Sequence, residues 1–189
     1  MMCIKSARAL AGVIPIRTKR LELVPATLTL IEAEMESPGK LGCLLEASVP
    51  PSWPPGEYDR SAMEFFRARL AENGDTVGWY GWYAIYRPEE GDEPVVIGAG
   101  GYLGPPDPDG VVEVGYSIAP EFRARAFALE LVQALVSRAF SVGGVARVIA
   151  HTKATNVGSI KVLKRCGFRL VGAGGEPGKL QYERSRLII

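Results

Sequence analysis

The clearest pattern in the chain lies between residues 111 and 140. Its first part alternates apolar and polar side chains, and this period of two predicts a strand. The apolar side of that strand carries Val112, Val114, Tyr116 and Ile118. Pro120 ends it, because proline has no N–H group to donate to a sheet. The second part predicts a helix, whose apolar stripe is Ala128, Leu131, Val132, Leu135, Val136, Ala139 and Phe140.

A short basic turn, Arg123-Ala124-Arg125-Ala126, joins this strand to this helix. The first N–H groups of a helix have no partner within it and carry the positive end of the helix dipole. Two arginines beside such a helix start suit a phosphate or pyrophosphate group. The pattern therefore predicts an anion site at the turn. A plain strand–helix unit with solvated arginines is the alternative that fits the same residues.

Shorter patterns predict the elements before this unit. Strands are expected at residues 17–25, 78–86 and 94–103, and helices at 26–36, 41–47 and 57–73. Prolines exclude residues 49–56 from a helix or a central strand. The last two of these strands and the strand at 111–118 follow one another through short turns, which predicts an antiparallel meander.

The elements after the central helix are also readable. Gly143-Gly144 ends that helix, and a β-branched strand is expected at 145–152. A helix separates it from the strand at 111–118, so the two strands should run parallel. A helix capped by Asn156 follows, and final strands are expected at 168–171 and 180–187. Without repeats or an internal linker, residues 1–189 are expected to form one domain, with residues 1–16 as a leader into the first strand.

Composition narrows the function classes. Lys plus Arg is 22 and Asp plus Glu is 21, so the net charge of +1 gives no reason to expect nucleic acid or a membrane surface as partner. A multi-histidine metal site is excluded because His151 is the single histidine. The three cysteines are far apart and odd in number, so they predict neither a disulfide framework nor a metal cluster. That usage favours a reducing, cytoplasmic compartment.

Two motifs together resemble a known family. Arg123-Ala124-Arg125-Ala126-Phe127-Ala128 opens a helix, and Asn156-x-x-Ser159-x-x-Val162-Leu163-x-x-x-Gly167-Phe168 follows about thirty residues later. They resemble the signature motifs of the GNAT N-acetyltransferases. With Glu113-Val114-Gly115-Tyr116, the resemblance is closest to the branch that acetylates protein N-termini, including those of ribosomal proteins. It implies an α/β fold with a mixed, mostly antiparallel sheet of six to seven strands, helices on both faces, and a central parallel pair that splays apart.

The first motif departs from the family pattern Gln/Arg-x-x-Gly-x-Gly/Ala. Arg123 and Ala128 fit, whereas Ala126 stands where glycine is expected and Ala124 replaces a common glycine. Alanine is comfortable at a helix start, so the backbone is expected to tolerate Ala126. Its methyl could nevertheless hold a pyrophosphate away from the N–H groups. Whether these alanines weaken cofactor binding is left open by the sequence.

The resemblance implies acetyl-CoA as co-substrate, with roles for three segments. The pyrophosphate would lie on the backbone amides of Arg123, Ala124, Arg125, Ala126, Phe127 and Ala128. The pantetheine arm would lie along Ser117, Ile118 and Ala119, in the gap between the parallel strands. Asn156 would hydrogen-bond that arm. No metal is implied.

The reaction needs an uncharged amine, so a proton must leave an ammonium whose pKa is ~8 to ~10. Glu113 is the expected base, directly or through water, unless it faces solvent or a neighbouring cation. Ser159 is expected to assist the leaving thiolate, because Leu163 stands where many GNAT enzymes have a tyrosine. The alternative for Ser159 is a hydrogen bond at the helix start. His151 is a second base candidate, but a lone strand histidine is more often structural.

The acceptor is not identified by the sequence. A primary amine is implied, either a protein N-terminal α-amino group or a small amine such as an aminoglycoside. A non-catalytic GNAT-fold module with a degenerate cofactor turn is a further alternative. Trp53, Tyr80, Trp82 and Tyr83 either shape the acceptor pocket or belong to the core. The oligomeric state is open, with a homodimer as the common arrangement of the family.

Overall fold

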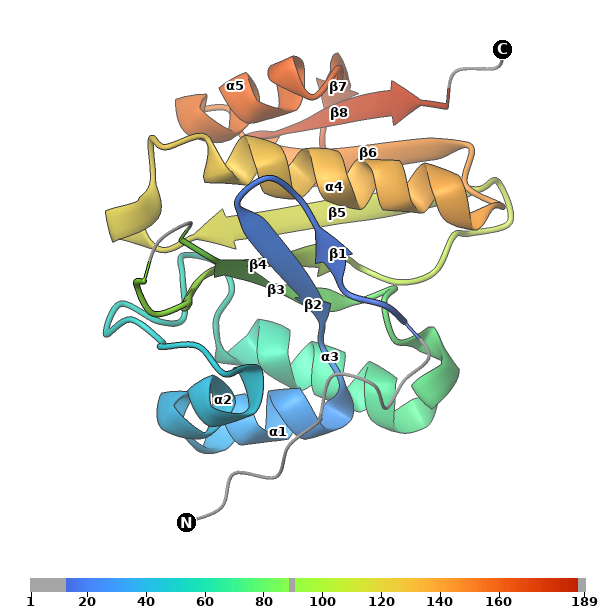
Figure 1. Ribbon diagram of the computed structural model, residues 1–189. Helices are drawn as coiled ribbons and strands as arrows, with labels where there is room; N and C mark the ends of the chain where they lie inside the picture. The colour runs from blue at the N-terminus through green and yellow to red at the C-terminus, as the bar shows by residue number, and fades with distance from the viewer. Residues whose placement is uncertain (1–12, 89–90, 187–189) are drawn as a thin grey trace.

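The computed structural model describes residues 13–88 and 91–186. Its strands are β1 (Ile16–Arg17), β2 (Leu21–Pro25), β3 (Gly81–Tyr86), β4 (Val95–Tyr102), β5 (Val111–Ile118), β6 (Arg147–Lys153), β7 (Arg169–Ala173) and β8 (Lys179–Ser185). Its helices are α1 (Leu28–Glu36), α2 (Pro38–Leu45), α3 (Arg60–Glu72), α4 (Phe127–Val142) and α5 (Val157–Arg165), with 3₁₀ turns at Gly74–Thr76 and Pro120–Phe122. Figure 1 shows α1, α2 and α3 grouped on one side of the sheet and α4 on the other.

The described strands form one eight-stranded sheet in the order β1-β2-β3-β4-β5-β6-β8-β7. Neighbours are antiparallel except β5 and β6, which are parallel. The α/β class, the meander of β3 to β5 and the mostly antiparallel sheet with helices on both faces are therefore confirmed. The expected six to seven strands are too few, because the single strand predicted at 17–25 is two strands. A turn at Thr18 separates β1 from β2, where the Thr18 N–H bonds the Leu21 carbonyl at 2.9 Å.

Some element boundaries differ from the prediction for local reasons. The second helix starts earlier than expected, since Ser37 caps it and Pro38 occupies its first position. The third helix starts at Arg60, because the Asp59 side chain accepts a hydrogen bond from the Ala62 N–H and caps it there. Asn156 caps α5 as predicted. Residues 1–12 of the expected leader lie outside the described residues, and Ile16 already belongs to β1.

Cys166 and Cys43 differ in oxidation state. Cys166 is a buried free thiol. Cys43 is disulfide-bonded, whereas the odd number and wide spacing of the cysteines predicted no disulfide framework.

The sheet separates two hydrophobic cores because strand residues alternate between its faces. In β3, Trp82 and Ala84 pack in the core beneath α4, while Tyr83 and Ile85 pack in the core beneath α1, α2 and α3. The aromatic run on both faces of this strand reflects its burial between two helical layers. None of the described helices is long and apolar enough to cross a lipid bilayer.

The parallel pair opens part-way along its length. Paired positions are Val111 with Arg147, Val112 with Val148 and Glu113 with Ile149, and the pairing stops there. Beyond this point β5 stays with β4 as far as Ile118, whereas β6 stays with β8 as far as Lys153. The predicted splay is therefore present, and each strand is held by a different neighbour on its outer side.

Candidate active site

A cavity of about 280 Å³ lies where β5 and β6 separate. Four of the residues selected from the sequence line it: Glu113, Ser117, Asn156 and Ser159. The rest of the wall comes mainly from β4, β6, α3, α5 and the loop that precedes α3. The other selected residues, from Ile118 to Ala128, lie at the end of β5 and in the turn that enters α4.

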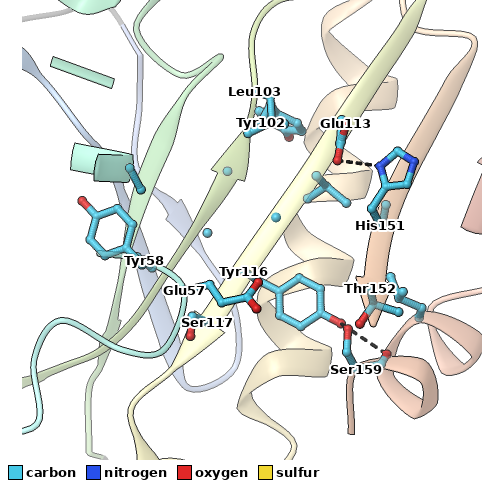
Figure 2. A pocket seen from close by; sticks show the side chains of 18 of the residues that line it. Glu57, Tyr58, Tyr102, Leu103, Glu113, Tyr116, Ser117, His151, Thr152 and Ser159 are labelled. Atoms are coloured by element: carbon cyan, nitrogen blue, oxygen red, sulfur yellow. Dashed lines mark hydrogen bonds and ion pairs between the residues drawn. The ribbon is translucent and has the colours of Figure 1, made fainter. Parts of the chain in front are cut away.

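Glu113, the last paired residue of β5, contacts His151 of β6 (Figure 2). The His151 Nδ1 atom lies 2.8 Å from Glu113 Oε1. An ionised carboxylate can only accept a hydrogen bond, so Nδ1 donates and the hydrogen is on that nitrogen. The side chain of Glu113 is 30% exposed and that of His151 is 22% exposed. Glu113 thus faces the cavity with an imidazole behind it, rather than standing alone in solvent.

Alternate residues of β5 give the cavity its floor. Val112, Val114 and Ile118 pack into the core beneath α4, which turns Glu113, Gly115 and Ser117 to the other face. A Cβ atom added to Gly115 would have nothing within 4 Å. The middle of this floor is therefore open space between a carboxylate and a hydroxyl.

Tyr116 reaches from β5 to the first turn of α5, as Figure 2 shows. Its hydroxyl lies 2.8 Å from Ser159 Oγ. Burial raises the pKa of Tyr116 to about 12, so the phenol is neutral at physiological pH. Sequence reasoning gave Tyr116 no role at the site. The signal was present in the Glu113-Val114-Gly115-Tyr116 segment, but the strand pattern alone did not indicate that this ring crosses the gap.

Asn156 and Ser159 are linked at the start of α5. The Asn156 Oδ1 atom accepts a hydrogen bond from the Ser159 N–H at 3.0 Å. This leaves the Asn156 amide NH₂ as the group that can face a ligand. Ser159 therefore makes the helix-start hydrogen bond through its backbone, while its hydroxyl is free to contact Tyr116.

The turn before α4 adopts a conformation that favours glycine. Ala124 has φ of 58° and Ala126 has φ of 62°, both left-handed. The expectation that Ala126 is comfortable at the helix start is wrong, since the helix begins at Phe127 and the Cβ of alanine disfavours positive φ. The Arg123 N–H donates to the Pro120 carbonyl at 3.2 Å, so the expectation that this amide faces a pyrophosphate is wrong. Within the described residues, the backbone N–H groups of Ala124 to Ala128 donate to no protein acceptor. They form a run of free donors at a helix start.

The two arginines of this turn have protein partners. Arg123 Nε donates to the Ile118 carbonyl at 2.8 Å. The Arg125 guanidinium carbon lies 5.1 Å from the centre of the Phe127 ring. The two side chains therefore brace the turn as well as giving it positive charge.

The end of β5 presents one edge to the gap. The Ala119 N–H donates to the Ile97 carbonyl at 2.8 Å, so this amide is used by β4. Peptide groups alternate in direction along a strand, which turns those of Tyr116 and Ile118 toward the open side. Of these, the Ile118 carbonyl is already bonded by Arg123.

A buried carboxylate anchors the loop on the other side of the cavity. Glu34 accepts hydrogen bonds from Trp53 Nε1 at 2.7 Å, Tyr58 OH at 2.8 Å and Tyr83 OH at 2.6 Å. Burial raises the pKa of Glu34 above its ordinary value, although these three hydrogen bonds lower it in part. Trp53, Tyr80, Trp82 and Tyr83 are core residues rather than pocket walls. Tyr58 and Phe66 line the cavity in their place.

The anchored loop lies across the end of β5. A Cβ atom at Gly56 would lie 2.5 Å from Ser117 Oγ. Glu57 Oε1 forms an exposed ion pair of 2.7 Å with Lys153 Nζ, at the end of β6. Ser52 Oγ donates to the Glu121 carboxylate at 2.8 Å. Among the described residues, no group of three or more His, Cys, Asp or Glu is arranged to hold a metal ion.

Known proteins resemble this chain in sequence and in fold. The family model described as an acetyltransferase (GNAT) domain matches residues 44–169. An uncharacterized N-acetyltransferase of Bacillus subtilis, YjdG, is 28% identical over 155 residues, which cover 82% of this chain and 89% of that protein. A putative ribosomal-protein-serine acetyltransferase from Vibrio cholerae has a similar structure, with a TM-score of 0.61, 18% identity and coverage of 94% of this chain and 100% of that one. The ribosomal L7/L12 α-N-protein acetyltransferase RimL, solved in complex with coenzyme A, gives a TM-score of 0.58 at 20% identity, covering 90% of this chain and 97% of that one.

Proposed function

Because this chain belongs to the GNAT acetyltransferases, which use acetyl-CoA, we propose that it transfers an acetyl group to a primary amine, with a protein N-terminal α-amino group as the preferred acceptor. The observation that carries the proposal is the Glu113–His151 contact beside the gap between β5 and β6, in a cavity shared with Ser159 and Asn156. We also propose that β1, β2 and β8 belong to the same domain as the matched residues, since they pair within one sheet.

The residues present fit acetyl-CoA at three places. The free N–H groups of Ala124 to Ala128 form an anion cradle at the start of α4, suited to a pyrophosphate. The open edge of Tyr116 and Ile118 suits an extended amide chain such as pantetheine. The Asn156 amide NH₂ is a donor for the same chain. When bound there, acetyl-CoA supplies the acetyl thioester.

Glu113 is the proposed base. Its Oε1 atom is bonded to His151, which leaves Oε2 to accept the proton of an incoming ammonium, directly or through one water. His151 is a positioning residue in this account. A Cβ atom at Gly174 would lie 2.9 Å from His151 Cδ2, so the far edge of the ring packs against the β7–β8 turn. The ring therefore holds the carboxylate and stabilises its charge from behind.

Tyr116 and Ser159 are proposed as hydrogen-bond donors to the leaving sulfur. Since the pKa of Tyr116 is about 12, and that of a thiol is about 8.5, transfer of the phenolic proton to a thiolate is unfavourable. A hydrogen bond to the sulfur does not require that transfer. The Tyr116–Ser159 pair would thus stabilise developing charge, with the proton finally supplied by solvent.

The charges around the cavity favour an acceptor with a single positive charge. Its lining carries Glu57 and Glu113 but also Lys153 and Lys179. Such a balance gives little reason for a polycation such as an aminoglycoside, which would need several unpaired carboxylates. Structural neighbours described as ribosomal-protein acetyltransferases support an α-amino group as the acceptor.

The test is an acceptor panel with acetyl-CoA as donor. Peptides with a free N-terminal Ser, Ala or Met are compared with the same peptides blocked at the N-terminus but carrying lysine, and with a simple polyamine and an aminoglycoside. Thiol release gives the rate, and mass spectrometry gives the position of the acetyl group. The proposal expects acetylation of free peptide N-termini above all. Release no faster than thioester hydrolysis with every acceptor would overturn it and favour a non-catalytic module.

A further inference from the structure

The turn between β1 and β2 rests on the start of α4, although about 110 residues separate them along the chain. In Figure 1 the hairpin of β1 and β2 lies against this helix. Glu130, in the first turn of α4, accepts hydrogen bonds from Thr18 Oγ1 at 2.6 Å and from the Arg20 N–H at 2.8 Å. The hairpin turn is therefore fixed to the helix that carries the anion cradle.

The side chain of Arg20 makes three further contacts at this place. Its Nε and Nη2 atoms both lie 2.8 Å from Glu130 Oε2. Its Nη1 atom donates to the Arg125 carbonyl at 3.0 Å. Its guanidinium carbon lies 4.3 Å from the centre of the Phe127 ring. One planar group thus connects the hairpin, the cradle and the first helical residue.

Arg125 stands between the two left-handed alanines, so the bonded carbonyl belongs to the peptide at the centre of the turn. Positive φ is unfavourable for alanine, and such a conformation persists only where surrounding contacts fix it. If Ala124 and Ala126 relaxed to negative φ, the N–H groups of the cradle would point in other directions. The Arg20 contact opposes that relaxation.

Arg20 also neutralises a charge that would oppose an anion. Glu130 is close to the cradle, and an unpaired carboxylate at this end of the helix would repel a bound phosphate. The contact of Arg20 Nε and Nη2 with Glu130 Oε2 pairs this charge within the protein.

We propose that Arg20 is a positioning residue for cofactor binding: by holding the Arg125 carbonyl and Glu130, it keeps the amides of Ala124 to Ala128 directed outward in a turn that lacks the glycines expected there. The proposal rests on the assigned role of this turn in binding the pyrophosphate of acetyl-CoA. It goes beyond that role, since it assigns the shape of the cradle to a residue of the N-terminal hairpin.

The test is a double-mutant cycle read by calorimetric titration with coenzyme A. Arg20→Met keeps the side-chain stem but removes the guanidinium, and is expected to weaken coenzyme A binding by about tenfold. It should raise the KM for acetyl-CoA by a similar factor while leaving kcat and the acceptor KM nearly unchanged. In the background of Ala124→Gly with Ala126→Gly, the same change is expected to weaken binding by less than about threefold, because glycine adopts positive φ without help.

Two further variants keep the outcome interpretable. Arg60→Met breaks an exposed ion pair with Glu64 in α3 and should leave coenzyme A binding unchanged. Arg20→Lys retains a charge near Glu130 but not the bridge to the Arg125 carbonyl, and should give an intermediate loss even if Arg20→Met is poorly folded. Wild-type affinity in Arg20→Met, or an equal loss in both backgrounds, would overturn the positioning role while leaving the proposed function standing. Absence of coenzyme A binding by the wild-type protein would overturn both.

Discussion

Glu113 and His151 meet across the parallel strands at the point where those strands part, with Nδ1 and Oε1 2.8 Å apart. The contact joins the last paired residue of β5 to a residue of β6 that lies beyond Ile149, where the pairing has ended. It therefore places the proposed base at the entrance of the gap, where β5 has an unpaired edge. A hydrogen-bonded pair at this point is suited to removing a proton from an amine without moving far from its resting geometry.

Gly115 sets the space available over the floor of the cavity. Gly115→Val should fold normally, because an added Cβ meets nothing within 4 Å and the position has ordinary strand geometry. The side chain would project between Glu113 and Ser117, so kcat/KM for the acceptor should fall by about tenfold or more. Gly172→Val in β7, where an added Cβ also meets nothing within 4 Å, is the matched control. Equal activity of both variants would show that the floor of β5 does not bound the acceptor site.

Ala126→Gly should stabilise the protein, which is unusual for a glycine substitution. Relief of a positive φ outweighs the greater freedom of glycine in the unfolded chain, and the free energy of unfolding should rise by about 0.5–1 kcal/mol. Ala134→Gly, in the middle of α4, should instead lower it by about 1 kcal/mol. Denaturant unfolding measures both. Destabilisation by Ala126→Gly would contradict the left-handed conformation of this residue.

Tyr116→Phe removes the hydroxyl that contacts Ser159 and should lower kcat by about three- to tenfold without changing coenzyme A affinity.

The same substitution should also change how the free energy of unfolding depends on pH in alkaline solution. The pKa of Tyr116 is raised to about 12 from 10.0, so the folded state keeps a proton that the unfolded state loses above pH 10. The resulting stability is fully present below pH 10.0 and declines toward about pH 12. The difference in unfolding free energy between wild type and Tyr116→Phe should shrink across that interval, and a constant difference would argue against the burial of this phenol.

Glu34 holds the loop that carries Glu57 and Tyr58, so Glu34→Gln should raise the KM for the acceptor more than that for acetyl-CoA. The amide offers one acceptor oxygen to three donors, and the free energy of unfolding should fall by about 1–3 kcal/mol.

Burial raises the pKa of Glu34 from 4.5, so its protonated form is favoured by folding. That stability is complete below pH 4.5 and is lost as pH rises through the raised pKa. The deficit of the variant should therefore be larger in mild acid than at neutral pH, and a deficit that grows with rising pH would contradict this assignment.

Sequence periodicity predicted the order of elements apart from the division of residues 17–25 into two strands, and the rule that a helix between two strands makes them parallel gave the direction of β6. The splay, and a site shared by Glu113, Ser117, Asn156 and Ser159, were implied by the resemblance of the motifs to the family and not by periodicity. The left-handed alanines could not be predicted, because alanine normally avoids positive φ and only surrounding contacts fix it here.

Contacts between distant segments could not be predicted from the sequence either. Arg20 reaches Arg125, and Glu34 reaches three aromatic residues, through tertiary packing that leaves no trace in the spacing of residues along the chain. The same holds for His151: a lone strand histidine is more often structural, and only the folded sheet shows its ring against Glu113. The role of a lone strand histidine depends on which residues the neighbouring strand places beside it.

The most direct measurement is the rate of acetyl transfer by Glu113→Gln at saturating acetyl-CoA and acceptor, with coenzyme A affinity measured on the same preparation. The variant retains a side chain of the same size that can still contact His151, but its amide cannot accept the amine's proton. The account predicts a fall in kcat of about 10²- to 10³-fold with coenzyme A affinity and melting temperature close to wild type. A kcat within about threefold of wild type would contradict it, because the proton would then have to leave by a route that does not involve this carboxylate.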